Sequence, residues 1–405
     1  MKISMHLRKS AHGSVDQFRG TKRLHIIRTT HSVVTDLVCL FVLPGFHFYN
    51  VLVVIREDGN LHLGMRNLCD NSHFECKNND TSKYDGEMNI NSCWYFTFAA
   101  MLVRDLPIYK HHQVSSLAWA IASAPLMANR TGNLHLLEED WCDDQFSKHA
   151  QWLMRLDLDP SPLISWLEQD NQKLLGKRFE SMLAFWFENS PFFECLIRNH
   201  TFVKNKNTTG EIDFIIRDKF SDEIFHLEVA CKYYIGVNHS KQWKNWIGPN
   251  GHDSLLLKME KLKQQVAILL GDAGKDLLRE LHLKSIPSRV LLKGFFFHPF
   301  HEVHNAVSPH NAHAHYNPGW YVRLSELENF ADSTSQWLIL PKTYWTCLYH
   351  FPLEENQVLS GTEMFAKANE LIQLKRKSLM LLQVHTEENM VHEISRGFVV
   401  ADKNF

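Results

Sequence analysis

The sequence has no paired cysteines, no long unbroken apolar run and no excess of either charge. Its eight cysteines are scattered without a CxxC pair, which is typical of reduced intracellular thiols rather than of a disulfide framework or a structural zinc site. The formal net charge is −2 over 405 residues, so no global positive field attracts nucleic acid and any such binding needs a local patch. The first residues lack the apolar segment of a signal peptide. We therefore predict an intracellular, cytoplasmic protein.

Residues 33–55 are the one stretch to be considered as a membrane segment. Asp36, Pro44, His47 and Asn50 interrupt it, whereas a spanning helix needs about 20 nearly unbroken apolar residues. We therefore expect a soluble chain with no membrane partner.

Familiar catalytic motifs are missing as well. The run "GDAGK" at residue 271 lacks both the spacing and the Ser or Thr of a phosphate-binding P-loop. No nucleophile triad and no HExxH metal motif is recognisable. The chemistry, if there is any, has to come from another arrangement of residues.

Residues 1–107 form a poorly patterned N-terminal extension. Strand-like pieces, "NVLVVIRED" and "WYFTFAAML", flank a polar tract without clear periodicity. Three interpretations stay open for this extension: a small domain, a disordered segment, or a start codon assigned too far upstream.

The pattern becomes regular after residue 107. Val114, Leu117 and Ile121 have helical spacing, and two short amphipathic helices are broken around Pro160 and Pro162. We expect a helical segment over residues 108–172.

Residues 173–300 predict a helix, three strands, a helix and a strand. In "LLGKRFESMLAFWFENSP" the apolar residues recur with the period of an amphipathic helix that ends near Pro191. The strand candidates are "FECLIRNHTFVKN", "GEIDFIIRD" and "EIFHLEVACKYYI", with turn-like tracts at 205–210 and 218–223. The helix "LLLKMEKLKQQVAILL" and the strand "SRVLLKGFFFHPF" complete an α/β layer.

Residues 301–405 predict a C-terminal α+β unit. It contains strand-like "GWYVRL" and "QWLILPKTYW" and a helix through "TEMFAKANELIQLKRKSLMLL". It begins with the loop "HEVHNAVSPHNAHAH", whose histidines are dense enough to bind zinc or nickel, although its Pro and Asn content indicates a flexible loop. Metal binding by this loop is one functional hypothesis.

Charged residues inside the second and third strands pose the main functional question. Side chains alternate along a strand, so Glu228 and Lys232 share one face of the third strand. In the second strand Ile212 and Phe214 lie opposite Asp213. If the strands pair, Asp213 and Glu228 approach each other, and two adjacent carboxylates favour a cation such as Mg²⁺ or Mn²⁺. The alternative is a solvated sheet face that carries a Glu–Lys pair.

The runs "GKRFESMLAFWFENSP", "GEIDFIIRD", "HLEVACKYYIG" and "WIGPNGHDSLLLKMEKLKQQ" resemble an uncharacterised bacterial family, domain of unknown function 1853. Members of this family look like PD-(D/E)xK phosphodiesterases. The resemblance implies a restriction-endonuclease-like core and a metal-dependent nuclease, with DNA favoured over RNA. It further implies that Asp213, Glu228 and the helix residue Glu180 hold Mg²⁺ or Mn²⁺. Lys232 would position water or stabilise charge on the phosphate.

One departure from that superfamily is serious. Its acid usually stands two residues before the lysine, where this chain has Ala230. Glu228 stands four residues before Lys232, about 13 Å along an extended strand. Either Glu180 supplies the missing ligand, or the site is degenerate. A degenerate site would make the protein a non-catalytic nucleic-acid-binding or scaffold protein.

The segment that follows the third strand is basic. Between residues 232 and 265, six lysines stand against two acids, and Trp243 and Trp246 are interleaved in "KQWKNW". Such a segment suits a patch that binds the phosphate backbone and stacks bases. The proposed phosphate-binding residues are Lys241, Lys244, Lys258 and Lys261. Solvated lysines and packed tryptophans are the alternative.

Overall fold

The computed structural model describes residues 25–31, 34–40, 49–57, 60–68, 107–330, 335–353 and 358–402. The chain divides into two compact units, residues 1–86 and 87–405. Among the described residues, no helix is long and apolar enough to cross a membrane.

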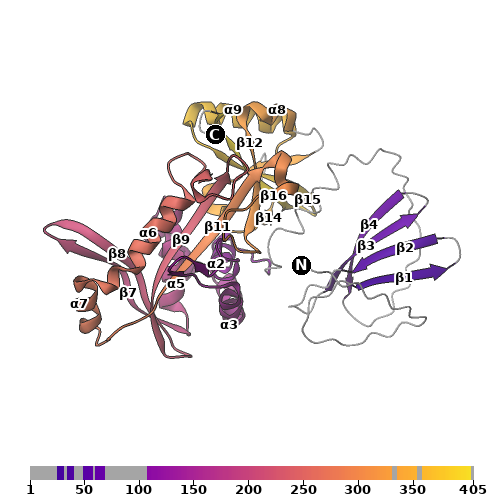
Figure 1. Cartoon of the computed structure of the whole chain (residues 1–405). Helices are drawn as coiled ribbons and strands as arrows, with labels where there is room; N and C mark the ends of the chain where they lie inside the picture. The colour runs from indigo at the N-terminus through magenta and orange to yellow at the C-terminus, as the bar shows by residue number, and fades with distance from the viewer. Residues whose placement is uncertain are drawn as a thin grey trace. The chain divides into compact units, whose positions relative to one another are not determined.

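The described residues of the first unit form two antiparallel β-hairpins (Figure 1). One pairs β1 (His25–His31) with β2 (Val34–Leu40), and the other pairs β3 (Tyr49–Glu57) with β4 (Asn60–Leu68). The predicted strand "NVLVVIRED" corresponds to β3, whereas the predicted strand "WYFTFAAML" lies outside the described residues.

The second unit is built on a ten-stranded mixed sheet. Eight strands cross it in the order β13-β15-β16-β12-β11-β9-β8-β7, while β10 pairs with β9 and β14 with β16. The strands are β7 (Phe193–Lys204), β8 (Asn207–Asp218), β9 (Glu223–Gly236), β10 (Trp246–Ile247), β11 (Ser288–Pro299), β12 (Asn317–Arg323), β13 (Gln336–Ile339), β14 (His350–Pro352), β15 (Leu379–Glu387) and β16 (Met390–Val400). Strands β7, β8 and β9 form an antiparallel meander, and β9, β11, β12 and β16 run parallel. A separate two-stranded ladder joins β5 (Arg130–Thr131) to β6 (Leu134–His135).

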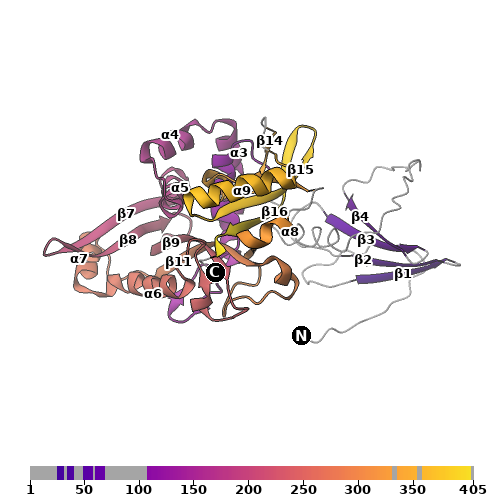
Figure 2. The same ribbon diagram turned by 90° about the horizontal axis from the view of Figure 1, so that it is seen from above.

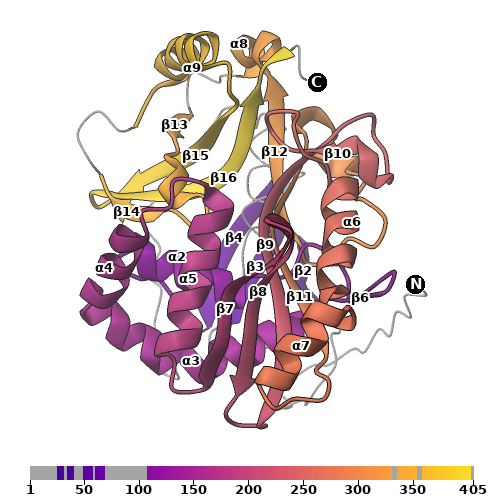
Figure 3. The ribbon, with the colours of Figure 1, turned by 90° about the vertical axis from the view of Figure 1, so that its left-hand side faces the viewer.

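Helices cover both faces of this sheet. Figure 3 shows α2 to α5 on one side of β7, β8, β9 and β11, and α6 and α7 on the other, and the view from above in Figure 2 agrees. The α-helices are α2 (His112–Ala122), α3 (Glu139–Leu158), α4 (Ser161–Asp170), α5 (Leu175–Asn189), α6 (Leu255–Val266), α7 (Asp272–Glu280), α8 (Leu327–Phe330) and α9 (Gly361–Lys375). Short 3₁₀ turns are η1 (Trp243–Asn245), η2 (Ile268–Leu270), η3 (Phe300–Asn305), η4 (Leu324–Glu326) and η5 (Lys342–Tyr344).

The expected order of helix, three strands, helix and strand is present as α5, β7, β8, β9, α6 and β11, with α7 inserted before β11. The first turn differs from the prediction. Asn205 and Lys206 have φ values of 51° and 64°, the left-handed conformation of a tight two-residue hairpin. Residues 207–210, expected in the turn, therefore belong to β8.

Two other boundaries differ from the prediction. The helix expected through "KRKSLMLL" ends at Lys375, where Arg376 adopts a left-handed φ of 51°, and the apolar run that follows is strand β15. A short apolar run fits a buried strand and a buried helix equally well, which explains the error. Strand β12 pairs in parallel with β11, so the residues after 300 extend the same sheet.

The apolar core lies on both faces of strand β9. One face, with Phe225, Leu227 and Val229, packs in the cluster under α5, to which Trp186 also belongs. The opposite face contributes Ala230 to the cluster beneath α6. Each large apolar side chain fully buried in this way contributes about 1.5–3 kcal/mol. Because helices cover both faces, Glu228 does not lie on a solvated sheet surface.

Candidate active site

Asp213 and Glu228 meet where the ladder between β8 and β9 ends. The last pair on this side is Phe214 with Leu227. Beyond it, the Asp213 N–H donates to Oε1 of Glu228 at 3.4 Å, and the Val229 N–H donates to Oδ2 of Asp213 at 2.9 Å. Two carboxylates thus take the place of main-chain acceptors, as the pairing of these strands predicted.

Both carboxylates are withdrawn from water. Asp213 is 5% exposed and Glu228 is fully buried. The pKa of each is raised to about 7, mainly by burial, and for Asp213 the negative charge of Glu228 is the second cause of that rise. Two like charges in so apolar a setting do not both ionise easily, so the pair retains a proton near neutral pH.

Polar neighbours fix the orientation of Glu228. The Gln265 amide donates to its Oε2, and Nε2 of His226 lies 2.9 Å from its Oε1. Burial lowers the pKa of His226 to about 4, so its ring is neutral. Ser288 Oγ donates to the Val266 carbonyl at 3.2 Å and lies 3.0 Å from Nδ1 of His226. In this arrangement Nδ1 carries the ring proton, and Nε2 accepts a hydrogen bond from the protonated carboxyl of Glu228.

Two lysines approach the acids in different ways. Lys232 was expected to act with them, but its side chain is 34% exposed and pairs with Asp253 at 2.5 Å. Lys258 of α6 is half-buried. Burial lowers its pKa, as does the charge of Lys232, whereas the charges of Asp213 and Glu228 raise it. Lys258 is therefore the lysine whose charge is coupled to both acids.

Sequence reasoning missed His226 and Gln265 and assigned Lys258 to a different role. A signal for each was present. His226 lies two residues before Glu228 in the same strand and so shares its face. Gln265 follows Lys258 by seven residues, two helical turns, and so shares its side of α6.

Glu180 is near the acid pair, but its carboxylate is not close enough to both acids to share a metal ion with them. Lys177 pairs with Glu180 at 2.5 Å and lies 3.8 Å from Glu211. Burial raises the pKa of Glu180, and the charge of Asp213 adds to the rise. Among the described residues, however, no group of three ligand atoms within 4.8 Å of one another contains Glu180, Asp213 and Glu228. A shared metal ion would require the Glu180 side chain to move.

The basic segment is only partly arranged as predicted. Lys241, Lys244 and Lys261 are exposed. Trp246 is 1% exposed and its indole donates to the Ser240 carbonyl, so it packs in the core and is not available for base stacking. The alternative of a packed tryptophan is therefore correct at this position.

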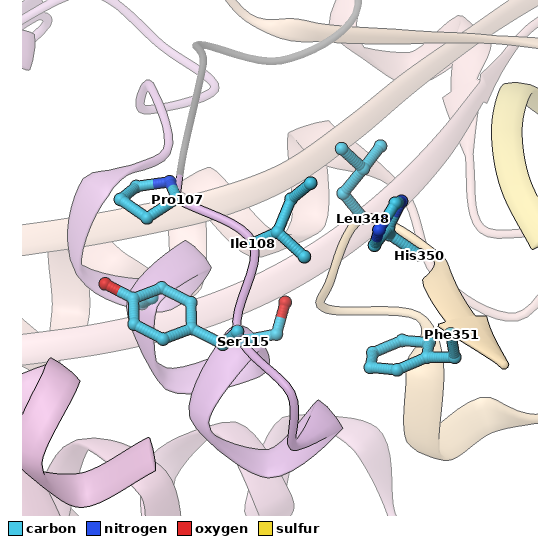
Figure 4. A pocket seen from close by; sticks show the side chains of 8 residues that line it. Pro107, Ile108, Ser115, Leu348, His350 and Phe351 are labelled. Carbon is cyan, nitrogen blue, oxygen red and sulfur yellow. The ribbon is translucent and has the colours of Figure 1, made fainter. Parts of the chain in front are cut away.

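Two cavities among the described residues lie away from the acid pair. One, shown in Figure 4, has Pro107, Ile108 and Ser115 on one side and Leu348, His350 and Phe351 on the other. The second lies near Trp246 and His298. Neither is lined by Asp213 or Glu228, so neither is assigned the chemistry of the acid pair.

The sheet and its acid pair define an α/β protein with two adjacent buried carboxylates. The chain belongs to the family described as Domain of unknown function (DUF1853), whose model matches residues 115–400. The match begins within α2 and ends at the last residue of β16, so the predicted family is confirmed and extends over the whole large sheet. No curated protein and no solved structure matches the chain.

Proposed function

We propose that this protein is a cytoplasmic metal-dependent nuclease that hydrolyses phosphodiester bonds, with DNA as the preferred substrate and RNA as the alternative. The observation that carries the proposal is the pair of adjacent buried carboxylates, Asp213 and Glu228, with Lys258 coupled to both. Burying two acids side by side is costly, and a divalent cation would remove that cost.

The donor atoms suit Mg²⁺ or Mn²⁺. Asp213 and Glu228 offer only carboxylate oxygens, the ligands that these ions prefer. Glu180 would complete the set after a side-chain movement. The ion, when bound, would lower the pKa of water and stabilise negative charge on the phosphate.

The side chains around the acid pair would each have a separate role in binding or catalysis. His226 and Gln265 hold Glu228 in one orientation, as outer partners of metal ligands do. Lys258 would face the phosphate and stabilise its developing charge. Lys232, held by Asp253, would contribute to the positive field beside it. The proton retained by the acid pair would be released when the cation binds.

The order of elements also supports the proposal. Helix α5, the antiparallel strands β7, β8 and β9, helix α6 and the parallel strand β11 follow the order expected of a restriction-endonuclease-like core. The acids lie on β8 and β9, and Glu180 lies on α5, as the PD-(D/E)xK resemblance implies. Ala230 remains the departure, because it stands where the superfamily has an acid; Glu228 and, after a side-chain movement, Glu180 would supply the carboxylates in its place.

The test is a cleavage assay with the full chain on linear duplex DNA and on single-stranded RNA, with Mn²⁺, Mg²⁺ or EDTA. Asp213→Asn should fold normally and lose cleavage by at least about 100-fold, the scale of losing a principal charge-stabilising group. Lys258→Met should keep Mn²⁺ binding, measured by calorimetry, yet lose turnover. Lys232→Met should do so only if Lys232 is the acting lysine, so the two variants decide between them.

The degenerate-site alternative has its own supporting observation. Glu228 is fully buried and Ala230 replaces the usual acid, as expected of a site that has lost one of its ligands. In that case the wild type would bind DNA without cutting it under any metal condition. If it also bound no Mn²⁺, and Asp213→Asn merely unfolded the chain, the acids would be structural and the nuclease proposal would be wrong.

A further inference from the structure

A second set of potential ligands lies away from the acid pair. Glu139, His313 and His315 place one ligand atom each within 4.8 Å of the others. Nδ1 of His315 lies 2.6 Å from Oε2 of Glu139, and Nε2 of His313 lies 3.9 Å from the same oxygen. The carboxylate thus lies between two imidazoles.

The chain holds these residues from two distant segments. Glu139 is the first residue of α3. The histidines follow a short stretch tied to residues 126–128, in which the His313 N–H donates to the Leu126 carbonyl at 2.9 Å and the Ala128 N–H donates to the Asn311 carbonyl at 2.8 Å. This part of the His-rich segment is fixed by main-chain hydrogen bonds, whereas a flexible loop was expected.

The donor set differs in kind from that of the acid pair. Two imidazoles and one carboxylate are ligands for zinc and its neighbours in the first transition row, and they suit Mg²⁺ poorly. Glu139 stands between Glu138 and Asp140, so the local charge attracts a cation. Three protein ligands leave at least one position of a zinc ion open to water.

We propose that Glu139, His313 and His315 form a zinc site that is independent of the Asp213–Glu228 pair. This proposal does not rest on nuclease activity. It assigns a ligand role to the His-rich segment that the acid pair does not explain.

Binding would rearrange two contacts. The proton shared by Nδ1 of His315 and Glu139 has to leave. The His315 N–H donates to Nδ1 of His313 at 3.1 Å, whereas coordination through Nε2 requires the ring proton on Nδ1, so that contact has to open. A neutral ring then keeps its proton on the nitrogen that does not bind zinc, whereas a ring that is protonated before binding releases one proton to the buffer.

The experiment is calorimetry of Zn²⁺ with the metal-free full chain that carries Asp213→Asn and Glu228→Gln, so that zinc cannot bind between those carboxylates. One equivalent of zinc should bind, with a heat that changes with the ionisation enthalpy of the buffer where a ring is protonated before binding. His313→Ala, His315→Ala and Glu139→Gln should each weaken binding by more than about 10-fold. Because His315 is 53% exposed, its variant is expected to fold normally, which circular dichroism would check.

His310→Ala is the matched control. His310 belongs to the same segment, its side chain is exposed, and its hydrogen bonds to Lys241 and Trp243 use main-chain atoms that alanine retains. It should bind zinc as the parent chain does. Co²⁺ in place of Zn²⁺ should give a visible spectrum that disappears in His315→Ala. Absence of zinc binding in the parent chain, or unchanged affinity in His313→Ala and His315→Ala, would overturn the proposal.

Discussion

Two pairs of buried charged side chains in the second unit meet the free-energy cost of burial in opposite ways. In β16, Arg396 is 1% exposed and Glu393 fully buried, and their charges are opposite and 2.5 Å apart. In β8 and β9, Asp213 and Glu228 are equally buried, and their charges are alike. The charges of Arg396 and Glu393 attract and compensate each other, whereas those of Asp213 and Glu228 repel.

The hydrogen bonds show the same contrast. The Arg396 guanidinium donates to Glu393 and to the carbonyls of Trp345 and Cys347, and it lies 4.8 Å from the Phe295 ring centroid. Burial would lower the pKa of Arg396, but Glu393 raises it above its usual value, which favours the charged form. For Asp213 and Glu228 a raised pKa favours the neutral form. The raised pKa of Arg396 therefore means that its charged form is stabilised by the protein. The raised pKa values of Asp213 and Glu228 mean that their charged forms are destabilised.

The largest expected effect comes from breaking the satisfied pair. Arg396→Met leaves Glu393 buried without its partner, so the free energy of unfolding should fall by about 3–5 kcal/mol. Urea denaturation of the metal-free chain measures this. Arg279→Met, at an exposed ion pair with Asp276, is the control and should change stability by no more than about 0.5 kcal/mol. Equal effects of the two variants would mean that burial does not distinguish these pairs.

The acid pair should respond in the opposite direction. The pKa values of Asp213 and Glu228 are near 7 when folded and about 4 when unfolded, so between these values the folded state binds more protons. Their contribution to stability therefore falls as the pH rises from about 4 to about 7. Asp213→Asn should make the metal-free chain more stable than wild type at pH 8 by about 1–3 kcal/mol, and the gain should vanish near pH 4.

The prediction is stated as the difference in stability between variant and wild type, because other groups change the stability of both over the same pH range. Burial lowers the pKa of His112, His226 and His298 to about 4, and these neutral rings gain stability as the pH rises over much of the same window. Asp222→Asn is the control, because Asp222 is exposed and its φ of 57° suits Asn. If the stability of the two Asn variants depends on pH in the same way, the carboxylates of Asp213 and Glu228 do not destabilise the folded protein.

A smaller effect is expected at the protein surface, where the lysines that follow β9 are compared with lysines just before β15 as contacts for DNA. Replacing Lys241 and Lys244 by Gln should weaken DNA binding at all sequences and lower the slope of log K against log salt by about two, close to one unit per lost phosphate contact. Fluorescence anisotropy with Ca²⁺ in place of Mg²⁺ measures this. Gln at the exposed Lys375 and Lys377, just before β15, is the control. An unchanged slope in the first variant would assign its lysines to a solvated surface.

The smallest effect is expected from removing the first hundred residues. Both regions lie within residues 107–402, in the unit that spans 87–405. A chain that begins at Met101 should stay folded, keep the pH response of Asp213→Asn and keep the large loss in Arg396→Met. Differential scanning calorimetry measures this. Aggregation, or a large drop in Tm, would show that the preceding residues contribute to the core.

The sequence was sufficient to predict that Asp213 and Glu228 come together. Strand patterns and turn residues define β8 and β9, and antiparallel pairing then leaves few possible registers. It was not sufficient to predict how β8 continues. Ile212 was expected to share a face with Phe214, but it packs with Ile215 and Leu269 in a different cluster. The ladder to β9 stops at Phe214, and the period of two does not predict where a strand leaves its neighbour.

By itself, therefore, the sequence determined the order of elements, the family and the pair of acids, because these follow from local periodicity and from motifs. Only the tertiary structure decided that the charge of Lys258 is coupled to both acids, and that His315 reaches Glu139 across 176 positions of chain. Both results depend on how a helix is placed against a strand or a loop. That placement is set by packing of the whole core, which no short window of sequence contains.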